Sequence, residues 1–172
     1  GLDLAPDTLA ISLFCYANAA LPALLDRWAE GDEPVACIVP QGVARSELDA
    51  WTGGAVPHAG APLARGRLSL AVAPFVDQDA FDRRLWACDL DFVRGEDSFV
   101  RAQWAATPFV WHVYPQEADA HLAKMDAFLS RLEAHATPEA REAQRAFWYA
   151  WNAGDGPAAS AAWPRYRTEL PV

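Results

Sequence analysis

Short apolar runs recur along the chain at intervals typical of strands in an α/β sheet. Each run contains few charged residues, as expected for a parallel strand that is buried on both faces. Segments with helical periodicity or with helix start signals separate the runs. The runs that we predict to be strands are residues 9–16, 35–39, 68–73, 88–93 and 109–113.

The helices are predicted from the spacing of their apolar residues and from the residues at their ends. Pro22 lies in the first turn of a helix that Gly31 stops. A longer amphipathic helix has apolar side chains spaced by three and four residues from Ala118 to Leu132. Other helices are expected at residues 45–51, after Asp77, at 98–104 and at 137–151.

Two segments lack a clear element. Residues 52–66 are rich in Gly, Pro and Ala, which predicts a mobile loop. The tail from Ala158, with Trp163 and Tyr166, is expected to pack on a neighbouring surface. We therefore divide the chain into a nucleotide-binding core of residues 1–136 and C-terminal helices of residues 137–172, which pack on the core or return toward a lobe outside this chain.

Strands that alternate with helices predict an α/β fold. We expect a Rossmann-like parallel sheet with right-handed crossovers and helices on both faces. The turn after the first strand lacks the GxGxxG pattern of dinucleotide sites, and the P-loop pattern GxxxxGK[ST] does not occur. The sequence therefore disfavours a simple NAD-binding module and a P-loop protein.

The composition is typical of one domain or of one lobe of a larger protein. Of the 172 residues, 52% are hydrophobic and 22% are charged, which is enough apolar surface for a core. The formal net charge of −9 disfavours general nucleic-acid binding and leaves open a non-enzymatic acidic interaction module. Because the chain begins at Gly1 and almost at once enters a buried strand, we expect an excised domain.

The cysteines indicate the compartment. Cys15, Cys37 and Cys88 form no even disulfide set and have no metal-ligand spacing, so we expect buried free thiols, a reducing environment and no metal site. No apolar run approaches the ~20 residues of a membrane helix, and no signal peptide is visible. We expect a cytoplasmic protein without membrane association.

Polar and aromatic side chains follow the ends of the predicted strands. The carboxyl ends of parallel strands meet at one edge of the sheet, where ligands bind in α/β folds. Taken singly, Asp77 and Ser98 are better explained as helix caps, but the set together favours a site. The strand-end residues are Tyr16, Asn18, Gln41, Phe75, Asp77, Gln78, the turn 94–98, Tyr114 and Gln116.

The chemistry of this set suits a nucleotide sugar. The free N–H groups of a helix that begins near Asp97 and Ser98 suit a diphosphate, and the Ser98 hydroxyl offers a further donor. Gly95 lets the backbone approach a ligand closely. A flat pyrimidine needs an aromatic face and an amide edge. Phe14, Tyr16 and Phe81 offer the faces, and Gln78 offers the amide.

Glu96 is the residue that fits a diphosphate site least. A carboxylate beside phosphates is repulsive unless it binds hydroxyls or a cation, so we interpret Glu96 as functional, with a simple Arg94–Glu96 ion pair as the alternative. Residues 89–93 also match DxDx[TV], the nucleophile motif of haloacid-dehalogenase-type phosphatases. That motif belongs after the first strand, so the phosphatase interpretation is disfavoured.

The stretch Leu85–Gln116 resembles the EarP family, the elongation factor P maturation arginine rhamnosyltransferases. The resemblance rests on SLFCY at 12–16, on PFV at 74–76 with Gln78, and above all on WACDLDFVRGEDSFVRAQWA and PFVWHVYPQ. It spans about residues 9–132 and is weaker in the loop 52–66 and in the tail.

The resemblance implies the C-terminal, donor-binding lobe of an inverting GT-B glycosyltransferase. The family is thought to transfer rhamnose from dTDP-β-L-rhamnose to one arginine of elongation factor P, without a cofactor. Its catalytic aspartates belong to an N-terminal lobe that this chain does not contain. A donor lobe for another nucleotide sugar stays an alternative. The resemblance places the family's important, catalytic-site glutamate at Glu96 and donor contacts at Phe14, Tyr16, Gln78, Phe81, Arg94, Asp97, Ser98 and Tyr114.

Three positions depart from the family pattern. Ala17 stands where an acidic residue is expected, Asp77 where proline is common, and Asp91 where asparagine is common. These departures affect the expected details of the first and third loops and not the assignment.

Overall fold

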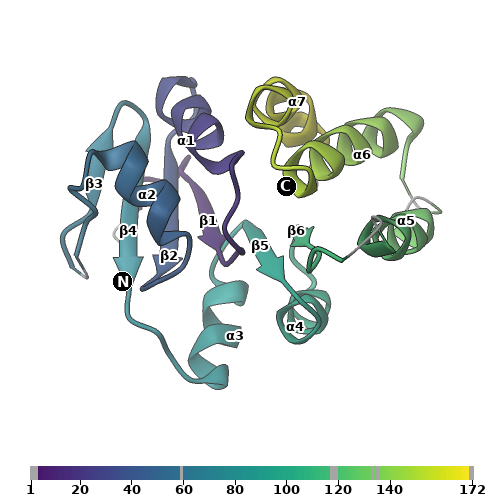
Figure 1. Ribbon diagram of the computed structural model, residues 1–172, viewed down its shortest axis with the longest axis horizontal. Coiled ribbons are helices and arrows are strands. Elements are labelled where there is room, and N and C mark those ends of the chain that lie inside the picture. The colour runs from purple at the N-terminus through teal and green to yellow at the C-terminus, as the bar shows by residue number, and fades with distance from the viewer. Residues whose placement is uncertain (1–3, 59, 117–119, 133, 135, 171–172) are drawn as a thin grey trace.

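A six-stranded sheet with the order β3-β4-β2-β1-β5-β6 forms the centre of the molecule (Figure 1). The computed structural model describes residues 4–58, 60–116, 120–132, 134 and 136–170; the expected helix start at Ala118 and the expected excision point at Gly1 lie outside them. The strands are β1 (Leu9–Leu13), β2 (Val35–Pro40), β3 (Leu63–Arg65), β4 (Leu68–Ala73), β5 (Leu90–Arg94) and β6 (Phe109–His112).

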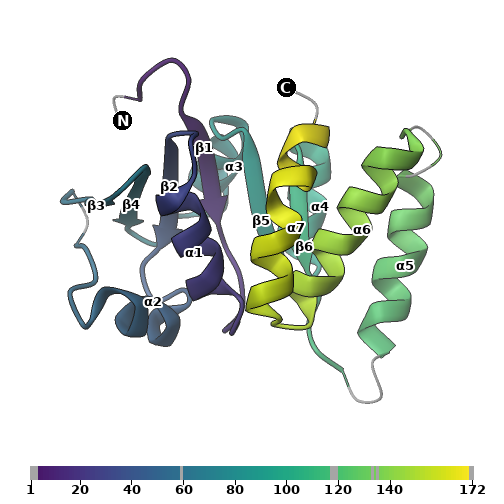
Figure 2. The same ribbon diagram turned by 90° about the horizontal axis from the view of Figure 1, so that it is seen from above.

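Helices cover both faces of this sheet, which confirms the predicted α/β architecture. Figure 2 shows α1, α6 and α7 on one side of the sheet and α3 and α4 on the other, with α5 beside α6. The helices are α1 (Leu21–Glu30), α2 (Arg45–Thr52), α3 (Gln78–Trp86), α4 (Asp97–Ala105), α5 (Ala120–Leu132), α6 (Pro138–Asn152) and α7 (Gly156–Glu169).

The parallel strands occur where the apolar runs predict them, with shifts of more than one residue at two ends. β1 ends at Leu13 rather than at residue 16, and β5 begins at Leu90 rather than at residue 88. Beyond Leu13 the Phe14 N–H still donates a hydrogen bond to the Phe92 carbonyl of β5, but the carbonyl oxygen of Cys15 accepts one from an arginine side chain. Apolar character alone therefore overestimates these strands, because it does not mark the residue at which regular pairing ends.

The segment 52–66 contains a strand that the sequence does not predict. β3 pairs antiparallel with β4 at the edge of the sheet through a turn at Gly66, whose φ is +56°. A Cβ atom at Gly66 would collide with the backbone of Ala29, so the turn needs glycine. Three half-exposed residues carry too little hydrophobic signal to stand out from a Gly- and Pro-rich loop.

The tail is also more regular than predicted, because α7 follows α6 directly. The residues between the two helices start α7: the Asp155 carboxylate accepts a hydrogen bond from the Ala158 N–H, and Pro157 occupies the first turn. Trp163 and Tyr166 are buried against the ring of Phe147, and Trp163 also packs against Trp28. These side chains thus complete the core of this chain, while the division at residue 136 stays a prediction.

The core between the sheet and α1, α6 and α7 is rich in aromatic side chains. Phe92 of β5 packs edge-to-face against Trp28, Phe147 and Trp151, with ring centroids 5.9, 6.2 and 4.9 Å apart. Such pairs add roughly 0.5–1.5 kcal/mol each to the stabilisation from burial. Packed aromatic rings therefore support β5, the strand that ends at Arg94.

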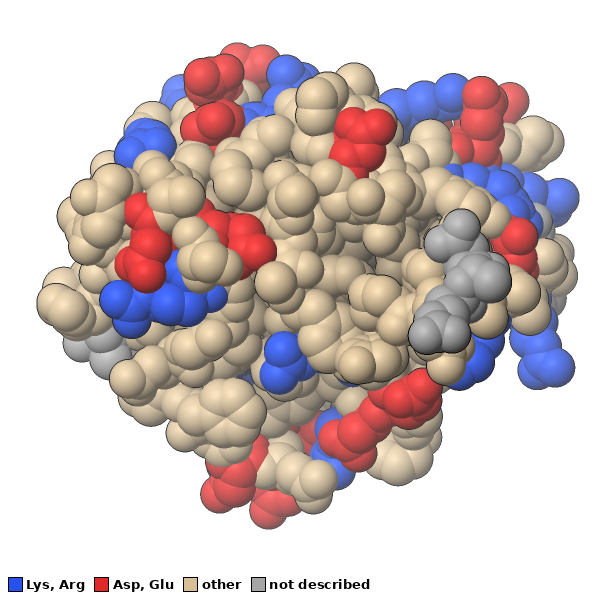
Figure 3. All heavy atoms as spheres, viewed as in Figure 1, with Lys and Arg blue, Asp and Glu red and all other residues tan. Residues whose placement is uncertain are grey.

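The structure bears on the predictions made for the cysteines, for membrane spans and for surface charge. Cys15, Cys37 and Cys88 are buried free thiols, and burial raises the pKa of Cys15 to about 12. Within the described ranges, no helix is long and apolar enough to cross a bilayer. Figure 3 shows acidic and basic side chains interspersed around a largely uncharged central surface on the face that it presents.

Candidate functional site

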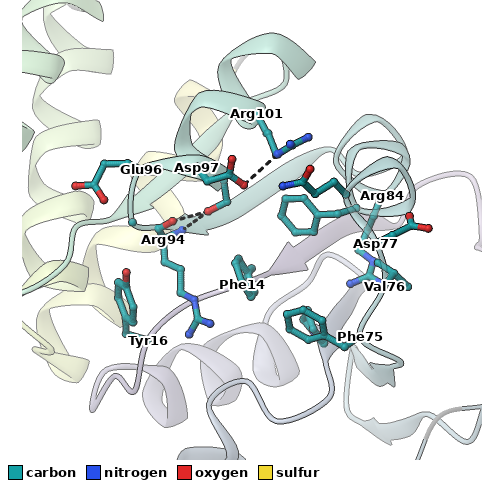
Figure 4. A pocket seen from close by; sticks show the side chains of 15 residues that line it. Phe14, Tyr16, Phe75, Val76, Asp77, Arg84, Arg94, Glu96, Asp97 and Arg101 are labelled. Carbon is teal, nitrogen blue, oxygen red and sulfur yellow. Dashed lines mark hydrogen bonds and ion pairs between the residues drawn. The ribbon is translucent and has the colours of Figure 1, made fainter.

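A pocket of about 500 Å³ opens at the carboxyl ends of β1, β4 and β5, the edge where the strand-end residues are predicted to converge. Figure 4 shows side chains from these strand ends and from α3 and α4 facing one another across it. Its lining residues are Phe14, Tyr16, Pro40, Phe75, Val76, Asp77, Gln78, Phe81, Arg84, Arg94, Gly95, Glu96, Asp97, Ser98 and Arg101.

All the predicted site residues except one line this pocket. The exception, Tyr114, is exposed beside it, with its ring centroid 5.4 Å from that of Tyr16. Three strand-end residues do not line it. Asn18 is buried, with its side chain bonded to the Trp151 carbonyl and the Ala20 N–H; Gln41 lines a neighbouring hollow; and Gln116 lies outside both.

The side chain of Arg94 is held by contacts with the segment that follows β1. Its Nη1 donates a hydrogen bond to the Cys15 carbonyl at 3.0 Å. Its guanidinium carbon lies 4.3 Å from the Phe14 ring centroid and 4.9 Å from that of Tyr16. Among the described residues it forms no ion pair with Glu96, so the structure contradicts the simple Arg94–Glu96 pair. Arg94 lines the pocket, and no carboxylate among the described residues neutralises its positive charge.

The N-terminus of α4 has no side-chain cap, which corrects the interpretation of Ser98 as a cap. The cap position is Glu96, and Ser98 is buried inside the first turn. The Ser98 Oγ accepts a hydrogen bond from the Arg94 N–H and donates one to the Arg94 carbonyl. The hydroxyl therefore holds the turn in shape, and the first N–H groups of α4 are the donors that an anion would meet.

Gly95 gives this turn its shape. Its φ is +60°, and its carbonyl accepts a hydrogen bond from the Trp111 indole at 2.7 Å. A Cβ atom at this position would lie 2.9 Å from the Tyr16 hydroxyl. The glycine thus permits both the left-handed backbone and the close approach of Tyr16.

Replacing Gly95 with alanine is expected to cost more stability than the backbone strain alone. Gly53 offers the matched control, because it has φ +65° and open space around its Cβ position. Left-handed alanine costs roughly 1–2 kcal/mol at either site, and the contact with Tyr16 adds about 1 kcal/mol at position 95. The free energy of unfolding, measured for both variants, checks this. Equal costs, or an excess that persists after Tyr16→Phe, contradict it.

The other end of the pocket is aromatic. The ring centroid of Phe14 lies 6.3 Å from that of Phe75 and 5.4 Å from that of Phe81, both edge-to-face. Phe75 is 66% exposed, so its ring offers apolar surface to a ligand in the pocket. Asp77 caps α3 by accepting a hydrogen bond from the Ala80 N–H at 2.8 Å, as the capping interpretation predicts. A planar ring suits this end.

The acidic residues of the pocket are of two kinds. The Asp97 carboxylate accepts a hydrogen bond from Arg101, and Arg101 also pairs with Asp82, at 3.1 and 2.8 Å. Glu96 is exposed, and no ion pair or side-chain hydrogen bond engages it among the described residues. Glu96 is therefore the acidic group of the pocket whose charge is free to meet a ligand.

Burial shifts the pKa values of two titratable groups on β5 and β6. Burial lowers the pKa of His112 to about 4, helped by the charge of Arg94, and its ring packs against that of Tyr16. Burial also raises the pKa of Asp91 to about 8, opposed by its hydrogen bond from Thr107. Neither Asp91 nor Asp89, whose carboxylate accepts a hydrogen bond from the Ala10 N–H, lines the pocket, in keeping with the disfavoured phosphatase motif.

Sequence reasoning missed two basic residues of the site. Arg84 and Arg101 line the pocket from within α3 and α4, beyond the strand ends. Their spacing held a signal: Arg84 follows Phe81 by three residues and Arg101 follows Asp97 by four, which places each pair on one helix face. No cluster of His, Cys, Asp and Glu among the described residues could hold a metal ion.

Three comparisons with known proteins agree. The family model described as "Elongation-Factor P (EF-P) rhamnosyltransferase EarP" matches residues 1–172. A protein-arginine rhamnosyltransferase of Pseudomonas putida is 47% identical over 152 residues, which are 88% of this chain and 40% of that protein. The corresponding enzyme of Pseudomonas aeruginosa is 45% identical over 161 residues, 94% of this chain and 42% of that protein.

A solved structure gives the same result for the fold. It is described as the structural basis for EarP-mediated arginine glycosylation of translation elongation factor EF-P. It superposes with a TM-score of 0.87 at 43% identity, over 98% of this chain and 53% of that chain. The present chain thus spans about half or less of the length of these relatives. It belongs to the EarP family of elongation factor P rhamnosyltransferases.

Proposed function

We propose that this chain is the donor-binding, C-terminal lobe of an inverting protein-arginine rhamnosyltransferase that takes dTDP-β-L-rhamnose and modifies elongation factor P. The observation that carries the proposal is the composition of the pocket. An uncapped helix N-terminus and an uncompensated arginine lie beside an aromatic wall in one cavity of about 500 Å³. Family membership supports rhamnose as the sugar and elongation factor P as the acceptor.

The two ends of the pocket suit the two ends of a nucleoside diphosphate. The N–H groups of the first turn of α4 and the guanidinium of Arg94 offer donors and positive charge to the diphosphate. Phe14, Phe75 and Phe81 offer faces and edges to the base, and the Gln78 amide lies beside them. In this assignment Ser98 acts through the turn that it holds, not as a direct hydroxyl donor.

We assign Glu96 to positioning of the sugar and not to the role of general base. An inverting transfer needs its base on the face of the anomeric carbon opposite the leaving diphosphate. Glu96 lies on the same turn as the α4 N–H groups that receive that diphosphate. The base and the acceptor arginine therefore approach from outside this chain, and catalysis needs no cofactor here. The reaction takes place in the cytoplasm, where the buried thiols of this chain stay reduced.

Calorimetry with dTDP tests the proposal. The wild-type protein is expected to bind dTDP, and Tyr16→Ala is expected to weaken binding about tenfold, because it removes a ring that holds Arg94 in place. Gln41→Ala is the matched control, since Gln41 follows a strand but does not line the pocket. The same titration with UDP and GDP separates the proposal from a donor lobe for another nucleotide sugar. No binding of any nucleotide at millimolar concentration by the folded protein would exclude both.

A further inference from the structure

Arg84 brings a positive charge to the pocket that has no acidic partner among the described residues. Its Nη1 is buried without a hydrogen-bond partner. Its Nη2 has one acceptor, the Pro74 carbonyl, at 3.5 Å, which is the outer limit of a hydrogen bond. Burial lowers the pKa of this guanidinium. A partly buried guanidinium with so few acceptors is costly, and a ligand that supplied an acceptor would remove part of that cost.

The position of Arg84 separates it from the other arginines of the pocket. Figure 4 shows its side chain running from α3 toward Val76 and Phe75, on the side of Phe14 opposite to Arg94. Arg101 is already neutralised by Asp82 and Asp97. Within the part of the chain that the structure describes, the pocket thus holds two cations without an acidic partner, Arg94 at the turn that precedes α4 and Arg84 among the aromatic rings. The second faces the place where a planar ring fits, not the place where phosphates fit.

We propose that Arg84 is a specificity-determining residue that donates a hydrogen bond to a carbonyl oxygen of the nucleobase. The proposal rests on the proposed function, because it needs the base to occupy the aromatic end of the pocket. A guanidinium has donors only and no acceptor. It therefore favours rings that present a carbonyl oxygen, such as thymine and uracil, and disfavours a ring that turns an exocyclic amine toward it, such as adenine.

The proposal is tested by the ratio of affinities for two nucleotides rather than by affinity alone. Calorimetry on the natural protein that contains this chain compares dTDP with dADP, which shares the deoxyribose and diphosphate. Arg84→Met keeps the apolar stem and removes the donors. It is expected to weaken dTDP about 10- to 100-fold, the range for a hydrogen bond to a charged group, and to weaken dADP much less. Arg83→Met, an exposed neighbour on the same helix, is the matched control and leaves both affinities unchanged.

Nucleotides with an altered base test the same hydrogen bond without relying on a single protein variant. In 5-methyldeoxycytidine diphosphate an amine replaces the O4 carbonyl of dTDP, and the methyl group is retained; 2-thio-dTDP alters O2 instead. At least one of the two is expected to bind the wild type about tenfold more weakly than dTDP. That difference is expected to vanish in Arg84→Gln and in Arg84→Met.

The outcomes separate this inference from the proposed function. If the wild type binds no dTDP, the proposed function fails. If it binds dTDP and Arg84→Met weakens dTDP and dADP by the same factor, Arg84 only supports the aromatic wall and the inference is wrong. If the analogues discriminate in the wild type and equally in Arg84→Gln, another group reads the base, and the inference is again wrong.

Discussion

Arg94→Met is expected to weaken dTDP binding about 100-fold, a larger loss than the tenfold one expected for Tyr16→Ala. The methionine keeps the packing against Phe14 and Tyr16 and removes a charge that has no acidic partner among the described residues. A hydrogen bond to a charged group contributes up to about 3 kcal/mol, and a diphosphate beside a helix N-terminus offers more than one such contact. Arg94→Lys is expected to recover only part of the affinity, because an ammonium cannot reproduce the planar stacking and the bond to the Cys15 carbonyl together.

Titrations at two salt concentrations separate charge from structure in this variant. The affinity of the wild type is expected to fall as salt rises, and that of Arg94→Met to fall less, since one charge contact is gone. Arg45→Met is the control: Arg45 is exposed, pairs with Asp49 and does not line this pocket. A loss of dTDP affinity with an unchanged salt dependence indicates a distorted turn, and not a missing charge, and contradicts the assignment.

The position of the site follows from the sequence because parallel topology places strand ends together. Tyr16, Phe75 and Arg94 are far apart in the chain, yet each follows a strand of the same sheet, so one edge collects them. Local periodicity likewise predicts α6 and the central strands close to where they occur, whereas it misses α7. Periodicity and turn residues are sufficient for features that depend on local pattern and on sheet topology.

What the sequence does not predict depends on where single side chains point. Asn18 follows β1 like Tyr16, but its amide faces inward and binds the Trp151 carbonyl across the core. Arg84 and Arg101 belong to the site because helical side chains lean toward the helix N-terminus, here the edge of the sheet with the pocket. The Ser98 hydroxyl is bonded to a backbone four residues earlier, a geometry that its place near a helix start does not distinguish from a cap.

Glu96 is the candidate site residue whose surroundings the structure describes most clearly. Its carboxylate is exposed, caps no N–H group and lies apart from the guanidinium of Arg94, on the Tyr16 side of the turn (Figure 4). If the N-terminus of α4 receives a diphosphate as proposed, a free carboxylate beside it repels the phosphates. Its contribution should therefore come from sugar hydroxyls, which accept and donate hydrogen bonds.

Glu96→Gln is accordingly expected to lower kcat/KM without lowering the affinity for the nucleotide. In a protein of the relatives' full length that contains this chain, kcat/KM for rhamnosyl transfer to elongation factor P should fall about 10- to 100-fold, since a hydrogen bond to a charged group is lost. Affinity for dTDP, which lacks the sugar, should stay equal or rise, because the repulsion is removed. Asp79→Asn, an exposed acid outside the pocket, controls for the change in net charge. Parallel losses in both measurements would make Glu96 a general binding group, whereas unchanged turnover would make it a structural carboxylate.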